Sequence, residues 1–208
     1  MELEWEAMSW AALPALAYFC ALPLYLRAAP PRKRIALSME LQSHAAIAST
    51  VVANYLLWAT LFEQQLAPPR PLYVVLGTVV IDTVEYWSHR LLHTPILFQK
   101  LHYVHHSIGT PHPTLSFVNH GLEIVFTTPP ILLGMLLCSC RFSEYCLATG
   151  LAFVATISDH VATNPTSFHV LHHCGNKRCN LQQPFFTYWD HVCGTYDTRS
   201  ALKIPFVP

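Results

Sequence analysis

The sequence is short of charged side chains. Only 12% of its 208 residues are Asp, Glu, Lys or Arg, whereas soluble globular domains carry roughly 25%. It also lacks an excess of either sign, with twelve basic and twelve acidic residues, and this argues against nucleic acid as the main partner. The seven cysteines are an odd number without a C-x-x-C pair. They do not fit the disulfide framework of a secreted domain.

What the sequence has instead is long apolar runs. Residues 7–26 and 41–62 carry no charge over 20 and 22 positions, which is enough to cross a bilayer as a helix. Three acids precede the first run where a signal sequence would be basic, so we expect a retained anchor. A third helix is expected from Pro71, apolar through Ile81.

Two shorter runs, residues 124–140 and 145–158, predict a short hydrophobic hairpin. The expected fold is therefore an all-α integral membrane protein with about three spanning helices plus this hairpin. Loops enriched in Lys and Arg face the cytosol. With the N-terminus outside, only Arg70 and Arg141 of the twelve basic residues fall on the outer side. The same orientation places every histidine-rich segment on the cytosolic face.

Histidine is the outlier of the composition, because twelve of the thirteen lie between His89 and His191. His89 and His93 are four residues apart, so on a helix both rings project from one face. Glu85 and Asp82 precede them on the same stripe. Asp82 interrupts an apolar run, and an ionisable residue at membrane depth marks a candidate functional site.

Two triplets repeat the helical spacing i, i+3, i+4, and they are His102, His105, His106 and His169, His172, His173. On a helix the three nitrogens of each triplet can converge. Eight neutral imidazoles packed together would lack hydrogen-bond partners, and charging them would create repulsion. A bound cation removes both problems, so the pattern predicts a metal site.

Two isolated histidines are predicted to join this site. His120 has Glu123 one turn later, and His160 follows Asp159 at the end of an apolar run. Nearby acids are expected to accept the second ring N–H of the ligands, with helix capping or charge at the lipid interface as the alternative. These acids are Asp82, Glu85, Glu123, Asp159 and Asp190.

Ten candidate imidazoles give capacity for two metal ions. Many imidazoles with few thiolates and nearby carboxylates suit iron, although zinc and copper also accept imidazole. A structural zinc site closes with four ligands, which is fewer than this set offers. The sequence therefore favours iron.

The ordered motifs resemble those of the fatty acid hydroxylase / sterol desaturase superfamily of membrane di-iron oxygenases, over roughly residues 80–197. They are His89-x3-His93, His102-x2-His105-His106, Asn119-His120-x2-Glu123, Asp159-His160, His169-x2-His172-His173 and Trp189-Asp190-x3-Gly194-Thr195-Tyr196. Within the superfamily, the stretch from Gly175 to Asp190 is most similar to sphingoid base (sphinganine) C4-hydroxylases.

The resemblance implies a multi-pass enzyme of the endoplasmic reticulum that uses O2 and two iron ions to hydroxylate a lipid C–H bond. Its substrate would be a sphingoid base or ceramide, and its electrons would come from NADPH through a reductase and cytochrome b5. Residues 71–208 would form the fatty acid hydroxylase-type catalytic region, and residues 1–70 the transmembrane anchor helices of the same domain. The histidines would be metal ligands, with no further catalytic side chain.

The chain departs from the superfamily pattern in two places. The segment 161–168 is shorter than in typical relatives, and Gly121 stands where a proline follows the Asn-His pair. Three other interpretations stay open. One is a sterol-modifying oxidase or desaturase with the same metal site, and another is a catalytically inactive scaffold. The third is a membrane metal-binding or transport protein, whose ligands would run through several spans.

Overall fold

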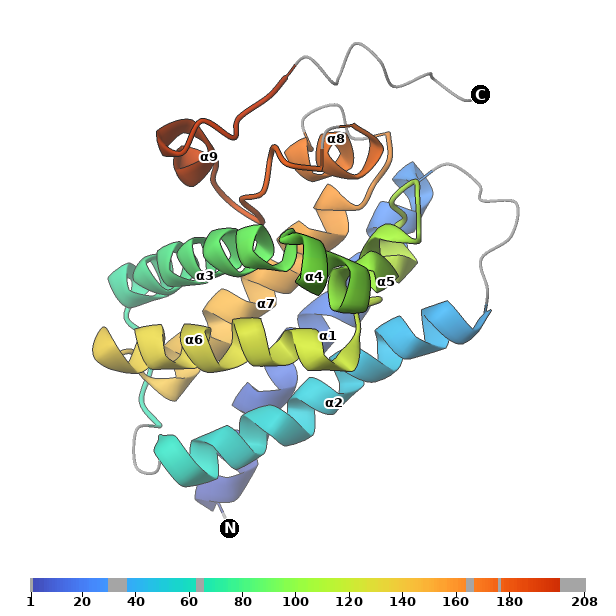
Figure 1. Cartoon of the computed structure of the whole chain (residues 1–208). Coiled ribbons are helices and arrows are strands. Elements are labelled where there is room, and N and C mark those ends of the chain that lie inside the picture. The colour runs from blue at the N-terminus through green and yellow to red at the C-terminus, as the bar shows by residue number, and fades with distance from the viewer. Residues whose placement is uncertain (1, 30–36, 63–65, 164–166, 176, 199–208) are drawn as a thin grey trace.

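The structure is a computed structural model that describes residues 2–29, 37–62, 66–163, 167–175 and 177–198. Within these ranges the chain forms helices and no strand (Figure 1). The long helices are α1 (Glu2–Ala28), α2 (Leu37–Leu61), α3 (Pro71–Leu92), α6 (Ile124–Leu137) and α7 (Phe142–Asp159). The short ones are α4 (Pro95–Leu97), the π-helix η1 (Phe98–His102), α5 (Tyr103–His106), the 3-10 turns η2 (Pro113–Leu115) and η3 (Gly121–Glu123), α8 (Phe168–Cys174) and α9 (Tyr188–Val192).

Local sequence explains where the site-bearing helices begin. Helix α3 starts with Pro71 at its first position after an extended Arg70, where the missing N–H of proline costs nothing. Helix α8 starts after Ser167, whose Oγ accepts the N–H of Val170 at 3.1 Å, an ordinary N-cap. Helix α7 starts after Arg141, whose N–H donates to the Glu144 carboxylate at 2.8 Å.

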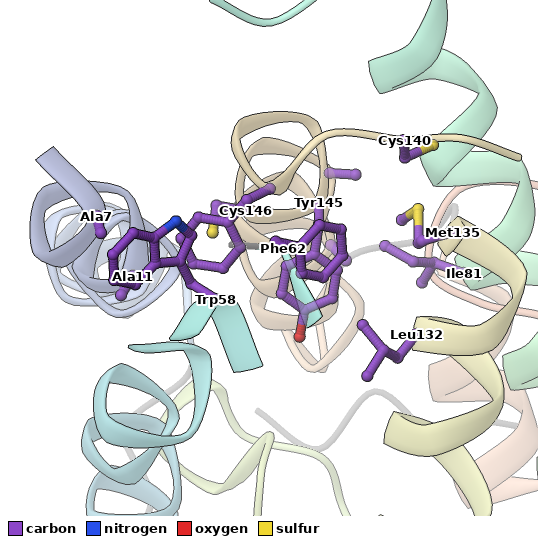
Figure 2. Packing of buried hydrophobic residues seen from close by; sticks show 13 residues of the cluster. Ala7, Ala11, Trp58, Phe62, Ile81, Leu132, Met135, Cys140, Tyr145 and Cys146 are labelled. Carbon is purple, nitrogen blue, oxygen red and sulfur yellow. The ribbon is translucent and has the colours of Figure 1, made fainter. Parts of the chain in front are cut away.

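The long helices share one apolar core. Helix α1 packs against α2 and α7, and α3 packs against α6 and α7. Figure 2 shows side chains from all five long helices meeting in this cluster, among them Ala11 of α1, Trp58 of α2, Ile81 of α3, Met135 of α6 and Cys146 of α7. Of the two predicted anchor helices, α1 therefore packs directly on α7, which ends next to His160, and α2 packs on α1.

The helical class is confirmed, and two helices are apolar and long enough to cross a membrane by length and composition. These are residues Leu3–Ala28 and Leu37–Leu61. Helix α3 is long enough, but Asp82, Glu85 and Arg90 interrupt its apolar character. The third span and the cytosolic face stay predictions, and the basic residues at 32–34 lie outside the described residues.

Helices α6 and α7 correspond to the two apolar runs that predicted a hairpin. Both helices pack against α3, so the structure places α3 as their common partner. Helices α8 and α9 lie above α3 in Figure 1 and away from the N-terminus, and α8 contacts α7. The site is built where the C-terminal ends of α3 and α7 meet α5 and α8.

Candidate metal centre

The structure gathers nine of the ten predicted histidine ligands into two groups. Group one is His89, His93, His102, His106 and His172, and group two is His105, His160, His169 and His173. Within each group one potential ligand atom per residue lies within 4.8 Å of all the others. His93 is half-buried and the other eight are buried. The arrangement offers two adjacent metal sites.

Each triplet contributes histidines to both groups. The sequence alone instead leads us to expect that the three nitrogens of a triplet converge on one site. The outer pairs, four residues apart, point to one group each: His102 and His106 to group one, His169 and His173 to group two. The remaining member points the other way, since His105 joins group two and His172 joins group one. Two short helices facing each other thus link the two sites.

In group two the ring nitrogens crowd around one point. The Nε2 atom of His173 lies 2.9 Å from Nε2 of His105 and 3.0 Å from Nε2 of His169. The Nε2 atom of His160 is buried and has no hydrogen-bond partner among the described residues. A buried polar atom without a partner is costly, and a metal ion at this point would bind all four nitrogens.

In group one the ring nitrogens are also close together. The Nε2 atom of His106 lies 3.2 Å from Nε2 of His93 and 3.1 Å from Nε2 of His172. The Nε2 atom of His93 is also 3.2 Å from Nε2 of His89, and Nε2 of His102 is buried without a partner in the part of the chain that the structure describes. These donors fit a transition metal that accepts imidazole.

Burial keeps the rings neutral, as ligation requires. Desolvation, and then the charge of neighbouring imidazoles, lowers the pKa of His102 to about 2. The same causes hold the pKa values of His169, His172 and His173 well below the ordinary value. Neutral imidazole offers a lone pair to a metal, whereas the protonated form does not.

In five of the nine rings Nδ1 lies near a hydrogen-bond acceptor, which leaves Nε2 free for the centre. The pairs are His89 with the Leu181 carbonyl at 2.8 Å, His172 with the Cys179 carbonyl at 2.8 Å, His160 with the Thr156 carbonyl at 2.8 Å, His105 with the Val118 carbonyl at 3.3 Å, and His102 with the Glu123 carboxylate at 2.9 Å. Four of the five acceptors are main-chain carbonyls. No residue type in the sequence marks these acceptors.

The five acids predicted to accept ring N–H groups have different roles in the structure. Glu123 accepts from His102. Asp82 and Asp190 instead accept backbone N–H groups of the 181–186 loop. Glu85 and Asp159 have no hydrogen bond to an imidazole among the described residues. Asp82 and Asp190 therefore hold the loop in place, and Glu85 lines the cavity described below.

His120 lies outside both groups. Its ring Nδ1 accepts the Leu122 N–H at 3.2 Å and its own N–H donates to Glu123 at 3.2 Å, so it caps the 3-10 turn η3. His160, despite the short segment that follows it, does lie in group two. Residues 164–166 of that segment are outside the described ranges.

A cavity of about 640 Å³ adjoins both histidine groups. It is in contact with His89 and His102 of group one and with His105 and His160 of group two. Four helices line the cavity, each along one face. The lining residues are 42, 45, 46, 47, 49, 50, 53, 54 and 57 of α2, 81, 85, 89 and 92 of α3, 124, 127, 128 and 131 of α6, and 145, 149, 152, 153 and 156 of α7.

The cavity is deep and mostly apolar. Along α7 its lining reaches from His160 to Tyr145, about 22 Å at 1.5 Å per residue. This exceeds one leaflet of a bilayer, whose whole hydrocarbon core is about 30 Å thick. A cavity of this length and volume suits a single lipid chain.

Comparison with known proteins agrees with the site. The chain is 28% identical over 144 residues to sphinganine C4-monooxygenase 2 of Arabidopsis thaliana, covering 62% of this chain and 56% of the relative. It is 30% identical over 133 residues to sphingolipid C4-hydroxylase sur2 of Schizosaccharomyces pombe, covering 56% and 45%. It is also 25% identical over 154 residues to a very-long-chain aldehyde decarbonylase of Oryza sativa subsp. japonica, covering 62% and 56%.

The chain thus spans about half the length of these curated relatives. No solved structure matches it. The fatty acid hydroxylase family model matches residues 74–195, which include all nine grouped histidines and the 181–186 loop. The chain belongs to the fatty acid hydroxylase family.

Proposed function

We propose that this chain is a membrane-bound oxygenase that uses O2 and two iron ions to hydroxylate a lipid C–H bond. The observation that carries the proposal is that one lipid-sized cavity adjoins both histidine groups. A C–H bond in that cavity would lie beside both metals. No nucleophilic or acid–base side chain is needed for such a reaction, and the protein supplies ligand geometry and a shaped pocket.

Iron would be held by the Nε2 atoms of the two groups, five in one and four in the other. When bound, the two ions supply the activation of O2 and the oxidation of the C–H bond. The chain's own contribution is to hold the ligand rings by their Nδ1 atoms and to exclude water with the apolar helix stripes. Zinc also accepts imidazole and is expected as a substitute when the protein is isolated.

The substrate that we propose is the sphingoid base sphinganine, hydroxylated at C4. Two of the relatives carry this activity in their names, and the cavity has the length of a lipid chain. A sterol-modifying oxidase is the alternative within the same chemistry. The likeness to an aldehyde decarbonylase makes long-chain aldehydes a third substrate class to measure.

The cellular setting is proposed from the same resemblance. Residues 1–70 would anchor the chain in the endoplasmic reticulum membrane, with residues 71–208 presenting the metal centre at the cytosolic face. Electrons would come from NADPH through cytochrome b5 and its reductase. A metal transporter fits less well, because the nine histidines form two compact groups rather than a path through several spans.

The decisive experiment is expression of the chain in cells that lack sphinganine hydroxylase, with sphingoid bases, sterols and long-chain aldehydes profiled together. Recovery of phytosphingosine supports the proposal, and His172→Ala should abolish it. A changed sterol or aldehyde pool with unchanged sphingoid bases would replace sphinganine by that substrate. Metal uptake that follows a transmembrane gradient would favour the transporter instead.

A further inference from the structure

Glu85 carries a carboxyl group that lines the cavity. It belongs to the α3 stripe that faces the cavity, one turn before His89. It is half-buried, and within the described residues its carboxylate has no hydrogen bond or ion pair. The ionisable side chains that act on it are two more acids, Asp82 and Glu123. A carboxylate in an apolar cavity is costly unless a donor or cation pairs with it.

The neighbouring acids are already engaged, which makes Glu85 different from them. Asp82 accepts the N–H groups of Phe185 at 3.1 Å and Phe186 at 2.7 Å. Glu123 accepts from His102 at 2.9 Å. These hydrogen bonds explain the positions of Asp82 and Glu123, but no hydrogen bond within the described residues explains that of Glu85.

Gln183 provides a second acceptor on the same cavity. Its Oε1 atom is buried and has no hydrogen-bond partner in the described part of the chain, and the residue lines the cavity together with Glu85. The loop that carries it is tied to Asp82, one turn from Glu85 on α3, through Gln182, Phe185 and Phe186. Two residues with an acceptor that has no partner among the described residues thus line one cavity next to the metal centre.

We propose that Glu85 and Gln183 together bind a hydrogen-bond donor, a hydroxyl or an amino group, that the lipid carries close to its oxidised carbon. One helical turn separates Glu85 from His89, with their Cβ atoms roughly 6 Å apart, so the donor would lie near the reacting C–H bond. This inference rests on the proposed function and narrows its substrate class. A plain hydrocarbon chain would leave both acceptors unpaired, and a site of this kind rejects such a ligand.

The test measures binding with the purified, iron-loaded full chain in detergent. Two probes compete for it, sphinganine and a saturated hydrocarbon of equal length without hydroxyl or amino groups. Wild-type protein should prefer sphinganine, and Glu85→Leu and Gln183→Leu should each weaken that preference, by about 10- to 100-fold for Glu85 because the bound donor is left unpaired. Glu85→Gln keeps the shape and an acceptor oxygen and should fall between. Glu6→Gln on the exposed part of α1 is the matched control.

Iron content is measured on every variant in parallel. A wild-type preference retained by both leucine variants would overturn the proposal, and so would equal binding of the two probes by wild-type protein. Loss of iron from Glu85→Gln would overturn it too, because the carboxylate would then serve the metal. The proposed function is judged separately, by whether wild-type protein forms phytosphingosine. If wild-type protein forms phytosphingosine and the Glu85 and Gln183 variants keep the wild-type binding preference, only the present inference is refuted.

Discussion

The Nδ1 atom of His89 lies 2.8 Å from the carbonyl oxygen of Leu181, although 92 residues separate them in the chain. Leu181 is itself held in place, since its N–H donates to Asp190 at 3.0 Å. Asp190 is buried and accepts the Gln182 N–H at 2.9 Å as well. The C-terminal loop thus orients a ligand ring of α3 through one main-chain peptide.

This chain of contacts makes Asp190 a positioning residue for the metal centre. In Asp190→Asn the amide nitrogen cannot accept an N–H, so either Leu181 or Gln182 loses its acceptor, and this loosens the peptide whose carbonyl orients His89. Loss of such outer contacts typically weakens metal binding 10- to 100-fold, and we expect about that factor here. Iron release to a chelator measures it. An unchanged release rate in a folded variant would show that His89 needs no such support.

The division of the triplets predicts that neighbouring histidines serve different ions. His172→Ala should deplete group one and spare group two, whereas His173→Ala should do the reverse. Each variant is expected to lose about half of the bound iron, since each group alone fits one ion. Metal analysis of purified protein, with the double variant as the lower limit, measures the loss. Two single variants that both keep full iron would contradict the assignment.

His120 offers a matched control for these variants. It was predicted as a ligand from its place beside Glu123, but its ring caps a 3-10 turn outside both groups. We therefore expect His120→Ala to keep the wild-type iron content, while His102→Ala loses iron. If His120→Ala were depleted as strongly as His102→Ala, the ligand set of group one would have to include it.

Helix periodicity predicted much of this structure because it depends on local sequence alone. The apolar runs at residues 124–140 and 145–158 correspond to α6 (Ile124–Leu137) and α7 (Phe142–Asp159). The i, i+4 spacing also identified the pairs that share a group, such as His89 with His93. Side chains on one helical face have to meet the same neighbour.

The remaining features depend on contacts between distant segments, which spacing does not encode. The π-helix at residues 98–102 changes the helical register at the start of the first triplet, because it ends at His102, and π-helices frequently occur at functional sites. His105 and His106 are adjacent in sequence yet belong to different groups because α5 and α8 face each other. The carbonyl acceptors could not be predicted, since every residue has a carbonyl group.

Tyr145 lies at the far end of the cavity and is expected to limit the length of the lipid chain. Its OH donates to Asn54 Oδ1 at 3.2 Å, and Asn54 donates in turn to the Ala11 carbonyl at 3.2 Å. Tyr145→Ala should extend the cavity and shift product toward chains longer by several carbons. Tyr145→Phe keeps the ring and should keep the chain-length profile, at a cost of about 1 kcal/mol in stability. Lipid profiling with mixed chain lengths tests both, and identical profiles would exclude a length limit at Tyr145.

Gly77 lets α3 pack closely against α6 and α7, the two helices that line the cavity together with it. A Cβ at this position would lie 2.9 Å from Cβ of Ala148 on α7 and 2.9 Å from Cε of Met135 on α6. Met135 can move its flexible end, but Ala148 moves only with its backbone, so Gly77→Ala has to push α3 and α7 apart. Overpacking of this kind costs about 1–3 kcal/mol, which should appear as a lower unfolding temperature in detergent. Gly121→Ala is the control, because its Cβ would meet nothing within 4 Å. Equal unfolding temperatures for the two variants would mean that the α3–α7 contact is loose enough to accept a methyl group.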